Sequence, residues 1–390
     1  MRILFVSEGV VEKCNNQYYK TNFSSLVERY NYFGSVYLCC YKKEVDVPNQ
    51  PLMVVSPEKY IFCEKENKIS TLISVRRKNK KKLREAISEC DIVVSHLPSR
   101  IGIYAIQIAQ KMRKPYFLGV VGCAFEALWN YNWKGRIIAI PTYLQVRYWV
   151  SKSKFIFYVT QSYLQKKYPS KGVSIGCSNV ELYPVSHRIL DEKLRKISEN
   201  REMKRLNIVT VGAVDVRYKG QRIVIEALSK LKKLNCKFHY FLVGGGNIDE
   251  LEKYARKYGV QEQIHFVGKL SPKKLFVFLD SMDLYIQSSF TEGLPRSLVE
   301  AMSRALPCLG TKVGGIPELL PDIYLYERQN VLSLVELLEA LNAEEMLKMA
   351  RENYLKATEY YFDELKKKRE LFFDKIIDNY CNNEKDYSNS

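Results

Sequence analysis

The chain of 390 residues is longer than one hydrophobic core usually supports, so its length predicts two domains. Its 46% hydrophobic and 12% aromatic residues exclude a disordered protein. The net charge of +18 lies almost wholly in residues 1–180, which carry 28 Lys and Arg against 12 Asp and Glu, and it favours an anionic partner. The densest basic run, 75–85, could by itself equally be a solvated helix.

The amino terminus and the cysteines bear on the cellular compartment. The first residues, MRILFVSEGV, hold only a short apolar run before Ser7 and Glu8, which predicts a β-strand and not a signal peptide. The sequence has no uninterrupted run of about 18 apolar residues, so we expect no transmembrane helix. The ten cysteines show no spacing typical of zinc, so we expect reduced, mostly buried thiols in a cytoplasmic protein.

The first half of the chain alternates β-type runs with helical spacing. Strands are predicted at 2–7, 35–40, 91–96, 115–121 and 155–160. Residues 99–113 have helical periodicity between two of these strands, which predicts a βαβ unit and a parallel sheet. We therefore expect an amino-terminal Rossmann-like domain over 1–185, followed by a polar interdomain linker over 186–206.

The second half repeats this alternation with clearer turns. Strands are predicted at 207–212, 238–246, 264–268, 284–289 and 306–311, and helices at 221–234, 248–258, 272–281 and 297–304. This order predicts a doubly wound α/β domain over 207–358. The tail, 359–390, is predicted as an amphipathic helix that packs back toward the first domain and frays at its end.

Four predicted strand ends in the second half carry glycines, several of them beside charged residues. Ligands of parallel sheets bind where the carboxyl ends of strands meet helix amino termini. The first strand end reads VGAVDVRYKGQ, with Gly212, Arg217 and Lys219, the second reads LVGGGN, with Gly244, and the third reads FVGKL. The fourth is SSFTEGLPRSLVEAM. One such glycine cluster alone is weak evidence, whereas four in one domain favour a nucleotide-diphosphate site.

The fourth strand end contains two glutamates whose spacing suggests chemistry. Glu292 is expected in a turn, and Glu300 lies about 2.2 helical turns later. Pro295 suits the first turn of a helix, whose free N–H groups and dipole favour an anion. Lys219 and Arg217 would approach the same anion, and the carboxylates would accept hydrogen bonds from sugar hydroxyls. Taken alone, Glu292 could instead be a helix-capping residue and Glu300 a glutamate on a helix surface.

The three segments VGAVDVRYKGQRIVIEAL, LVGGGNIDELEKYARKYGVQEQIHFVGKL and SSFTEGLPRSLVEAMSRALPCLGTKVGGIPELL resemble the carboxyl-terminal domain of GT-B-fold glycosyltransferases. They are most similar to the retaining family 4, which has a Glu-x7-Glu motif. The resemblance implies an α/β GT-B fold with two Rossmann-like domains that face each other across a cleft. It also implies transfer of a sugar from a nucleotide-diphosphate sugar to an acceptor hydroxyl.

The resemblance further implies roles for individual residues. Glu292 would contact the donor sugar, Glu300 the nucleotide ribose, and Lys219 the diphosphate, so Glu292 and Lys219 are expected catalytic residues. The expected donor-binding residues are Gly212, Arg217, Gly244, Val267, Gly268, Gly293, Leu294, Pro295 and Glu300.

The chain departs from the family pattern in two places that matter for catalysis. Ala213 stands where the family usually has arginine, and Arg217 is the candidate substitute. Gly122 and Cys123 stand where many relatives have a histidine. His96 is then the remaining candidate catalytic residue of the first domain, although a structural histidine at a strand end is an equally good interpretation.

The expected partners are a nucleotide-sugar donor, held without a metal because no DxD-type cluster occurs, and a glycan or lipid-linked glycan acceptor. The basic first domain would dock on the anionic inner face of the cell membrane, as in bacterial surface polysaccharide synthesis. Alternatives are a nucleotide-sugar epimerase on the same fold, a nucleic-acid-binding protein and a NAD-dependent dehydrogenase. No nucleic-acid-binding motif is present, and the G-x-G-x-x-G fingerprint is absent after the first strand.

Overall fold

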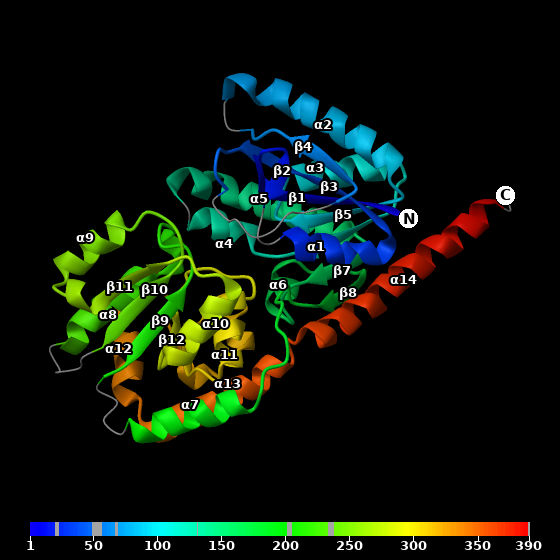
Figure 1. The fold of residues 1–390 in the computed structure, drawn as a ribbon. Helices are drawn as coiled ribbons and strands as arrows, with labels where there is room; N and C mark the ends of the chain where they lie inside the picture. Colours follow the sequence, from blue (N-terminus) through cyan, green and yellow to red (C-terminus); the bar gives the residue numbers. More distant parts are fainter. Residues whose placement is uncertain are drawn as a thin grey trace.

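The computed structural model describes residues 1–19, 23–48, 57–66, 69–130, 132–200, 205–232 and 238–388. Figure 1 shows two α/β domains, each built on its own sheet and covered by helices. Among the described residues, all strand pairings in the two sheets are parallel except that of β1 with β2. The predicted pair of doubly wound Rossmann-like domains is confirmed.

The first sheet has the strand order β4-β3-β1-β5-β6-β7-β8, with β2 paired antiparallel to the end of β1. The order changes direction between β1 and β5, which is the place where doubly wound sheets bind ligands. Three strands in this sheet, β2, β4 and β8, were not predicted, because they are short and lie at its margins. The strands are β1 (Arg2–Cys14), β2 (Gln17–Tyr19), β3 (Ser35–Glu44), β4 (Lys59–Cys63), β5 (Ile92–Leu97), β6 (Tyr116–Val120), β7 (Phe155–Tyr158) and β8 (Val173–Gly176).

Two helices of the first domain, α3 and α5, begin at a side-chain cap. Ser99 accepts a hydrogen bond from the Gly102 amide before α3, and Asn132 does the same for Gly135 before α5. The predicted helix at 99–113 corresponds to α3. The helices are α1 (Phe23–Tyr30), α2 (Leu72–Glu89), α3 (Arg100–Lys111), α4 (Ala124–Trp129), α5 (Trp133–Lys152) and α6 (Tyr163–Lys167).

The second sheet has the order β11-β10-β9-β12-β13-β14, and its direction changes between β9 and β12. The loops that follow these two strands therefore meet at one edge, where ligands of such sheets bind. Only the last strand, β14, was not predicted. The strands are β9 (Asn207–Val211), β10 (His239–Val243), β11 (Ile264–Gly268), β12 (Leu284–Gln287), β13 (Cys308–Thr311) and β14 (Leu325–Tyr326).

The helices between these strands agree with the periodicity of the sequence. The prediction of 272–281 coincides with α10, and the predictions of 248–258 and 297–304 differ from α9 and α11 by one residue at each end. The prediction of 221–234 agrees with α8 over the described residues. Residues 233 and 234, predicted as the end of a helix, lie outside the described residues. The helices are α8 (Gln221–Lys232), α9 (Asp249–Lys257), α10 (Pro272–Ser281), α11 (Arg296–Ser303), α12 (Val331–Ala340) and α13 (Ala343–Thr358).

Most of the segment expected to be a linker is a packed helix, α7 (Arg188–Glu199), which lies beside α13 (Figure 1). Its Lys193 is only 4% exposed and donates to the carbonyl oxygens of Asp280 and Met282, at 3.0 and 2.6 Å. Burial lowers the pKa of Lys193 to about 8. This lysine satisfies carbonyls at the end of α10, which a helix cannot satisfy internally.

The carboxyl-terminal helix, α14 (Phe362–Ser388), runs along the first domain, red in Figure 1. Phe372, Phe373 and Ile376 are buried in the core of that domain. The Phe373 ring lies 4.7 Å from that of Phe33, centroid to centroid. The helix continues through the residues expected to fray, as far as Ser388. The last element of the chain is therefore held by the first domain.

We predict that Phe373→Ala lowers the free energy of unfolding of the first domain by about 3 kcal/mol, because truncation leaves a cavity among buried rings. The matched control is Leu371→Ala on the same helix, where the native side chain is 58% exposed. The control variant should change the free energy by less than about 0.5 kcal/mol. Urea unfolding measures both, and equal losses would show that α14 does not pack on this core.

Candidate active site

The loop after β9 packs closely against the loop after β12. Gly220 has φ +71°, and a Cβ there would lie 1.9 Å from the carbonyl oxygen of Ser288, so only glycine fits. The Ser288 hydroxyl donates to the carbonyl of Lys219 at 2.9 Å, and the Phe290 amide donates to the carbonyl of Tyr218 at 2.7 Å. These contacts hold Lys219 beside the end of β12.

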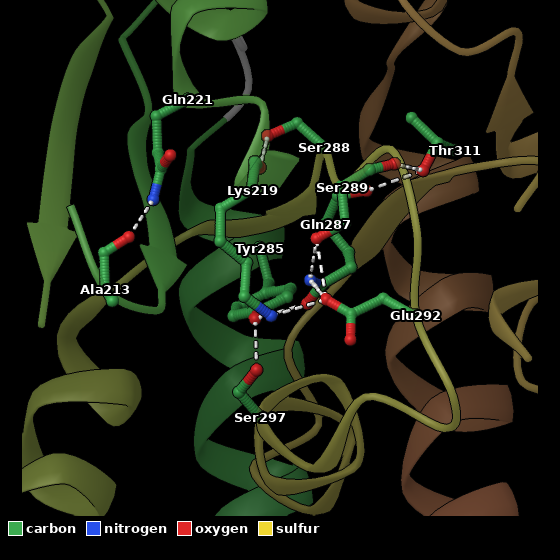
Figure 2. A network of polar contacts seen from close by, with 10 residues as sticks. All are labelled: Ala213, Lys219, Gln221, Tyr285, Gln287, Ser288, Ser289, Glu292, Ser297 and Thr311. Atoms are coloured by element: carbon green, nitrogen blue, oxygen red, sulfur yellow. Dashed lines mark hydrogen bonds and ion pairs between the residues drawn. The ribbon is translucent and has the colours of Figure 1, made fainter. Parts of the chain in front are cut away.

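Lys219 and Glu292 form an ion pair at the edge where β9 and β12 end. Lys219 Nζ lies 2.6 Å from Glu292 Oε1, and the two side chains are 23% and 12% exposed. The same oxygen accepts hydrogen bonds from Ser289 Oγ at 2.7 Å and Gln287 Nε2 at 3.1 Å. Figure 2 shows the other carboxylate oxygen directed away from these donors. One oxygen of Glu292 is thus held by three donors, and the other points away from them.

A second layer of buried polar groups orients the donors to Glu292 (Figure 2). The Tyr285 hydroxyl donates to Gln287 Oε1 at 2.8 Å, so the amide nitrogen of Gln287 faces Glu292. Burial raises the pKa of Tyr285 well above its ordinary value, which keeps the phenol protonated. Thr311 Oγ1 donates to the carbonyl of Ser289 at 2.6 Å. Our sequence reasoning missed these residues, although polar residues that end a buried strand were a usable signal.

The ends of β9, β10 and β11 form a row of glycines. A Cβ on Gly244 would lie 2.0 Å from the carbonyl oxygen of Gly212, and the Gly244 amide donates to the carbonyl of Gly268 at 2.9 Å. Gly268 has φ +76° and is exposed, while the neighbouring Val267 is half-buried. Three of the predicted donor-binding glycines, Gly212, Gly244 and Gly268, are therefore adjacent at the carboxyl ends of neighbouring strands.

The turn after Glu292 approaches the first domain closely. A Cβ on Gly293 would lie 2.6 Å from the carbonyl oxygen of Val121, in the loop between β6 and α4. Leu294 is buried, at 7% exposed. Pro295 stands at the N-cap of α11, one position before the first turn in which it was expected. The first-turn amides that follow it have no partner within the helix.

Glu300 lies on α11 and is half-buried. Burial raises the pKa of Glu300 above its ordinary value of 4.5, Arg296 opposes this rise, and Glu181 adds to it. Glu181 itself pairs with Arg29 of the first domain at 2.8 Å. Within the described part of the chain, no hydrogen bond joins Glu300 to the network around Glu292.

Two predicted residues lie away from this network. Arg217 is 68% exposed and pairs with Glu250 at 3.0 Å. His96 is 7% exposed, and its Nε2 lies 2.7 Å from the hydroxyl of Tyr30 in an aromatic cluster. Burial lowers the pKa of His96 to about 3, so the imidazole is neutral. Arg217 shares a short 3-10 helix with Lys219, but its side chain pairs with Glu250, and the His96 side chain is held in the aromatic cluster.

Three further features concern metals, cysteines and membranes. No group of three or more His, Cys, Asp or Glu side chains is placed to hold a metal ion among the described residues. The eight cysteines whose side chains are described are buried, and none of them forms a disulfide. In the same parts of the chain, no helix combines the length and hydrophobicity needed to cross a bilayer.

Comparison with known proteins places this site in a family. Residues 191–357 match the family model Glycosyl transferases group 1. The chain is 30% identical to protein CapJ of Staphylococcus aureus over 346 residues, 87% of this chain and 85% of CapJ. It is 27% identical to the amylovoran biosynthesis glycosyltransferase AmsK of Erwinia amylovora over 164 residues, 40% of each chain.

A solved structure shares the fold. Anabaena HepE in complex with UDP-glucose superposes with a TM-score of 0.66 at 14% sequence identity, over 96% of this chain and 100% of HepE. The family match falls on the domain that carries Lys219 and Glu292. The chain therefore belongs to the glycosyl transferases group 1 family and is a glycosyltransferase of the GT-B fold.

Proposed function

We propose that this glycosyltransferase moves a sugar from a nucleotide-diphosphate sugar to a hydroxyl of a lipid-linked glycan, with retention at the anomeric carbon, in bacterial surface polysaccharide synthesis. The observation that carries the proposal is the Lys219–Glu292 pair at the edge of β9 and β12, beside the first turn of α11. The names of two similar proteins support it, because AmsK is an amylovoran biosynthesis glycosyltransferase and HepE is described with UDP-glucose.

The donor diphosphate would bind between Lys219 and α11. A lysine ammonium has three N–H groups, and Glu292 takes one of them, so two remain for phosphate oxygens. The first-turn amides of α11 and the positive end of its dipole add further stabilisation for an anion. The glycine row at the ends of β9 to β11 would leave room for the nucleoside.

Glu292 would bind the transferred sugar. Three donors hold its Oε1, so its Oε2 has a fixed position from which to accept a sugar hydroxyl. Glu300 would accept hydrogen bonds from the ribose hydroxyls, because a carboxylate can accept from both at once.

The transfer step needs few groups from the protein. The bond between the anomeric carbon and the phosphate oxygen breaks, and the acceptor oxygen bonds to the same face of that carbon. The acceptor proton passes to the departing phosphate oxygen. The protein stabilises the charge that grows on the diphosphate and holds the acceptor in place. We assign no step to His96, because Tyr30 occupies its Nε2 in a buried cluster.

We predict that Lys219→Met and Glu292→Gln each lower kcat/KM about 100-fold or more, because each removes a group that acts on the reacting diphosphate or sugar. Thermal-shift screening with UDP-, GDP- and ADP-sugars first identifies the donor, and release of nucleoside diphosphate then gives the rate. The matched control is Lys230→Met, near the far end of α8, which should keep the native rate. Near-native turnover in either site variant, with an unchanged Tm, would contradict the proposal.

Glu300 predicts a pH dependence of donor binding. Its pKa is raised, so its carboxylate is lost as pH falls through a value above 4.5, and the protonated form is a poorer acceptor for ribose hydroxyls. The Kd for the nucleotide sugar should rise as pH falls through that range. Glu300→Gln should bind about tenfold more weakly at neutral pH and show no such rise. Calorimetric titration checks this, and parallel pH profiles for the two proteins would refute the assignment of Glu300.

We also propose that Lys219 and the α11 amides supply the charge stabilisation without a divalent metal. Treatment with EDTA should then leave the rate unchanged. A loss of activity that added Mg²⁺ or Mn²⁺ restores would show that a metal shares this task.

A further inference from the structure

Helix α5 has apolar residues on two opposite faces. One face packs into the first domain through Gly135, Ala139, Val146, Trp149 and Val150. The residues of the other face recur every three or four positions, which places them on one side of a helix. This second face, which we name the α5 stripe, consists of Trp133, Ile137, Ile140, Leu144 and Tyr148, with side chains 68%, 67%, 55%, 56% and 53% exposed.

Basic residues flank the α5 stripe on both sides. Lys134, Arg136, Arg147 and Lys152 are exposed, and none of them forms an ion pair with a described residue. The region from 101 to 180 contains 11 Lys and Arg and a single acidic residue, Glu126. Glu126 already pairs with Lys167 at 3.4 Å. The surface around the stripe is therefore cationic.

A hollow extends the α5 stripe toward the loop after α6. Leu144, Tyr148 and Pro169 line it together with Arg147 and Lys171, and its volume is about 430 Å³. Apolar walls and two cations suit a phosphate-bearing lipid headgroup with the start of its acyl chains.

We propose that the α5 stripe inserts into the interfacial region of an anionic lipid bilayer, with the flanking cations bound to lipid phosphates. Apolar residues beside a basic border are the pattern of helices that lie in the plane of a membrane surface. A second copy of the chain fits less well, because pairing two stripes would bring two cationic borders together.

The basic run on α2 differs from the α5 stripe. Arg76 pairs with Glu66 at 3.6 Å, Lys78 pairs with Glu64, and Lys82 donates to the carbonyl of Phe62 at 2.7 Å. Several cations of this run therefore already bind groups of the protein itself. Ile73 is the one exposed large hydrophobic residue of α2. Helix α2 adds to the long-range attraction of the domain, whereas α5 has the groups that enter the bilayer.

Helix α5 is connected to the donor site along the chain. The reason proposed here for membrane binding, access to a lipid-linked acceptor, rests on the proposed function. The chain passes from β6 through the loop at Val121 into α4 and then α5. Val121 is also the residue that Gly293 of the donor-site turn approaches. Insertion of α5 would therefore bring the site close to a lipid-linked acceptor.

The tryptophans of this chain give a direct test. All three, Trp129, Trp133 and Trp149, lie in or next to α5, and Trp149 is buried. Vesicles of phosphatidylcholine with phosphatidylglycerol should shift the emission to the blue, and brominated acyl chains should quench it. Trp133→Phe should remove most of both effects while the protein still sediments with the vesicles. Unchanged emission at saturating anionic vesicles would overturn the proposal.

Vesicle sedimentation tests the rest of the α5 stripe. Ile137→Ser, Ile140→Ser and Leu144→Ser together should lower partitioning at least about tenfold, because three apolar side chains no longer leave water. The matched control changes three exposed hydrophobic residues of the second domain, Val277, Ile323 and Leu355, to serine, and it should partition like the native chain. Equal partitioning of the two triple variants would overturn the proposal. It would also be overturned if the native chain formed a dimer that the α5 triple variant, but not the control, failed to form.

Failure of this inference can be told apart from failure of the proposed function. The α5 triple variant should bind a nucleotide sugar in solution with native affinity, because none of its changes touches the donor site. Loss of membrane partitioning with native donor binding supports the inference. A native chain that inserts α5 but neither binds nor turns over a nucleotide sugar would contradict the proposed function alone.

Discussion

The site depends on one electrostatic contact between two loops that lie 73 residues apart in the sequence. Lys219 reaches Glu292 because β9 and β12 are neighbours at the point where the second sheet changes direction, so the loops after them meet. An ion pair that is only partly exposed would be costly without further hydrogen bonds. Ser289 and Gln287 provide them, and Tyr285 orients Gln287. The position of Glu292 Oε1 is therefore set by several buried polar residues together.

The same loops also join the two domains. Gly293 leaves no room for a side chain between the donor-site turn and Val121. Nearby, Glu318 of the second domain accepts hydrogen bonds from the amides of Gln161, Ser162 and Tyr163 at the start of α6, at 2.5, 2.9 and 2.7 Å. Helix α14 adds a third connection when it packs on the first domain. A reaction that needs a donor from one domain and an acceptor from the other requires this closeness.

The sequence predicted the parts of this structure that depend on local patterns. Buried parallel strands, helical periodicity and the glycines at strand ends were all readable, and the sequence also singled out Lys219 and Glu292, which the structure places in contact. Side-chain partners that are distant in the sequence and that no motif marks were not readable. The charged segment at 186–206 resembled a linker because nothing local shows that Lys193 finds carbonyl acceptors at the end of α10. Arg217 pairs with Glu250, 33 positions away, and His96 with Tyr30, 66 positions away, so neither contact has a local signal.

The central claim is that Lys219 and the first turn of α11 hold the diphosphate of a sugar nucleotide. A crystal structure of the chain with UDP, or with whichever nucleotide stabilises it most, tests this directly. The account predicts a β-phosphate oxygen within hydrogen-bond distance of Lys219 Nζ and of an α11 amide, with the base on the glycine row. A nucleotide bound elsewhere, with the Lys219–Glu292 pair undisturbed and no phosphate beside it, would contradict the account.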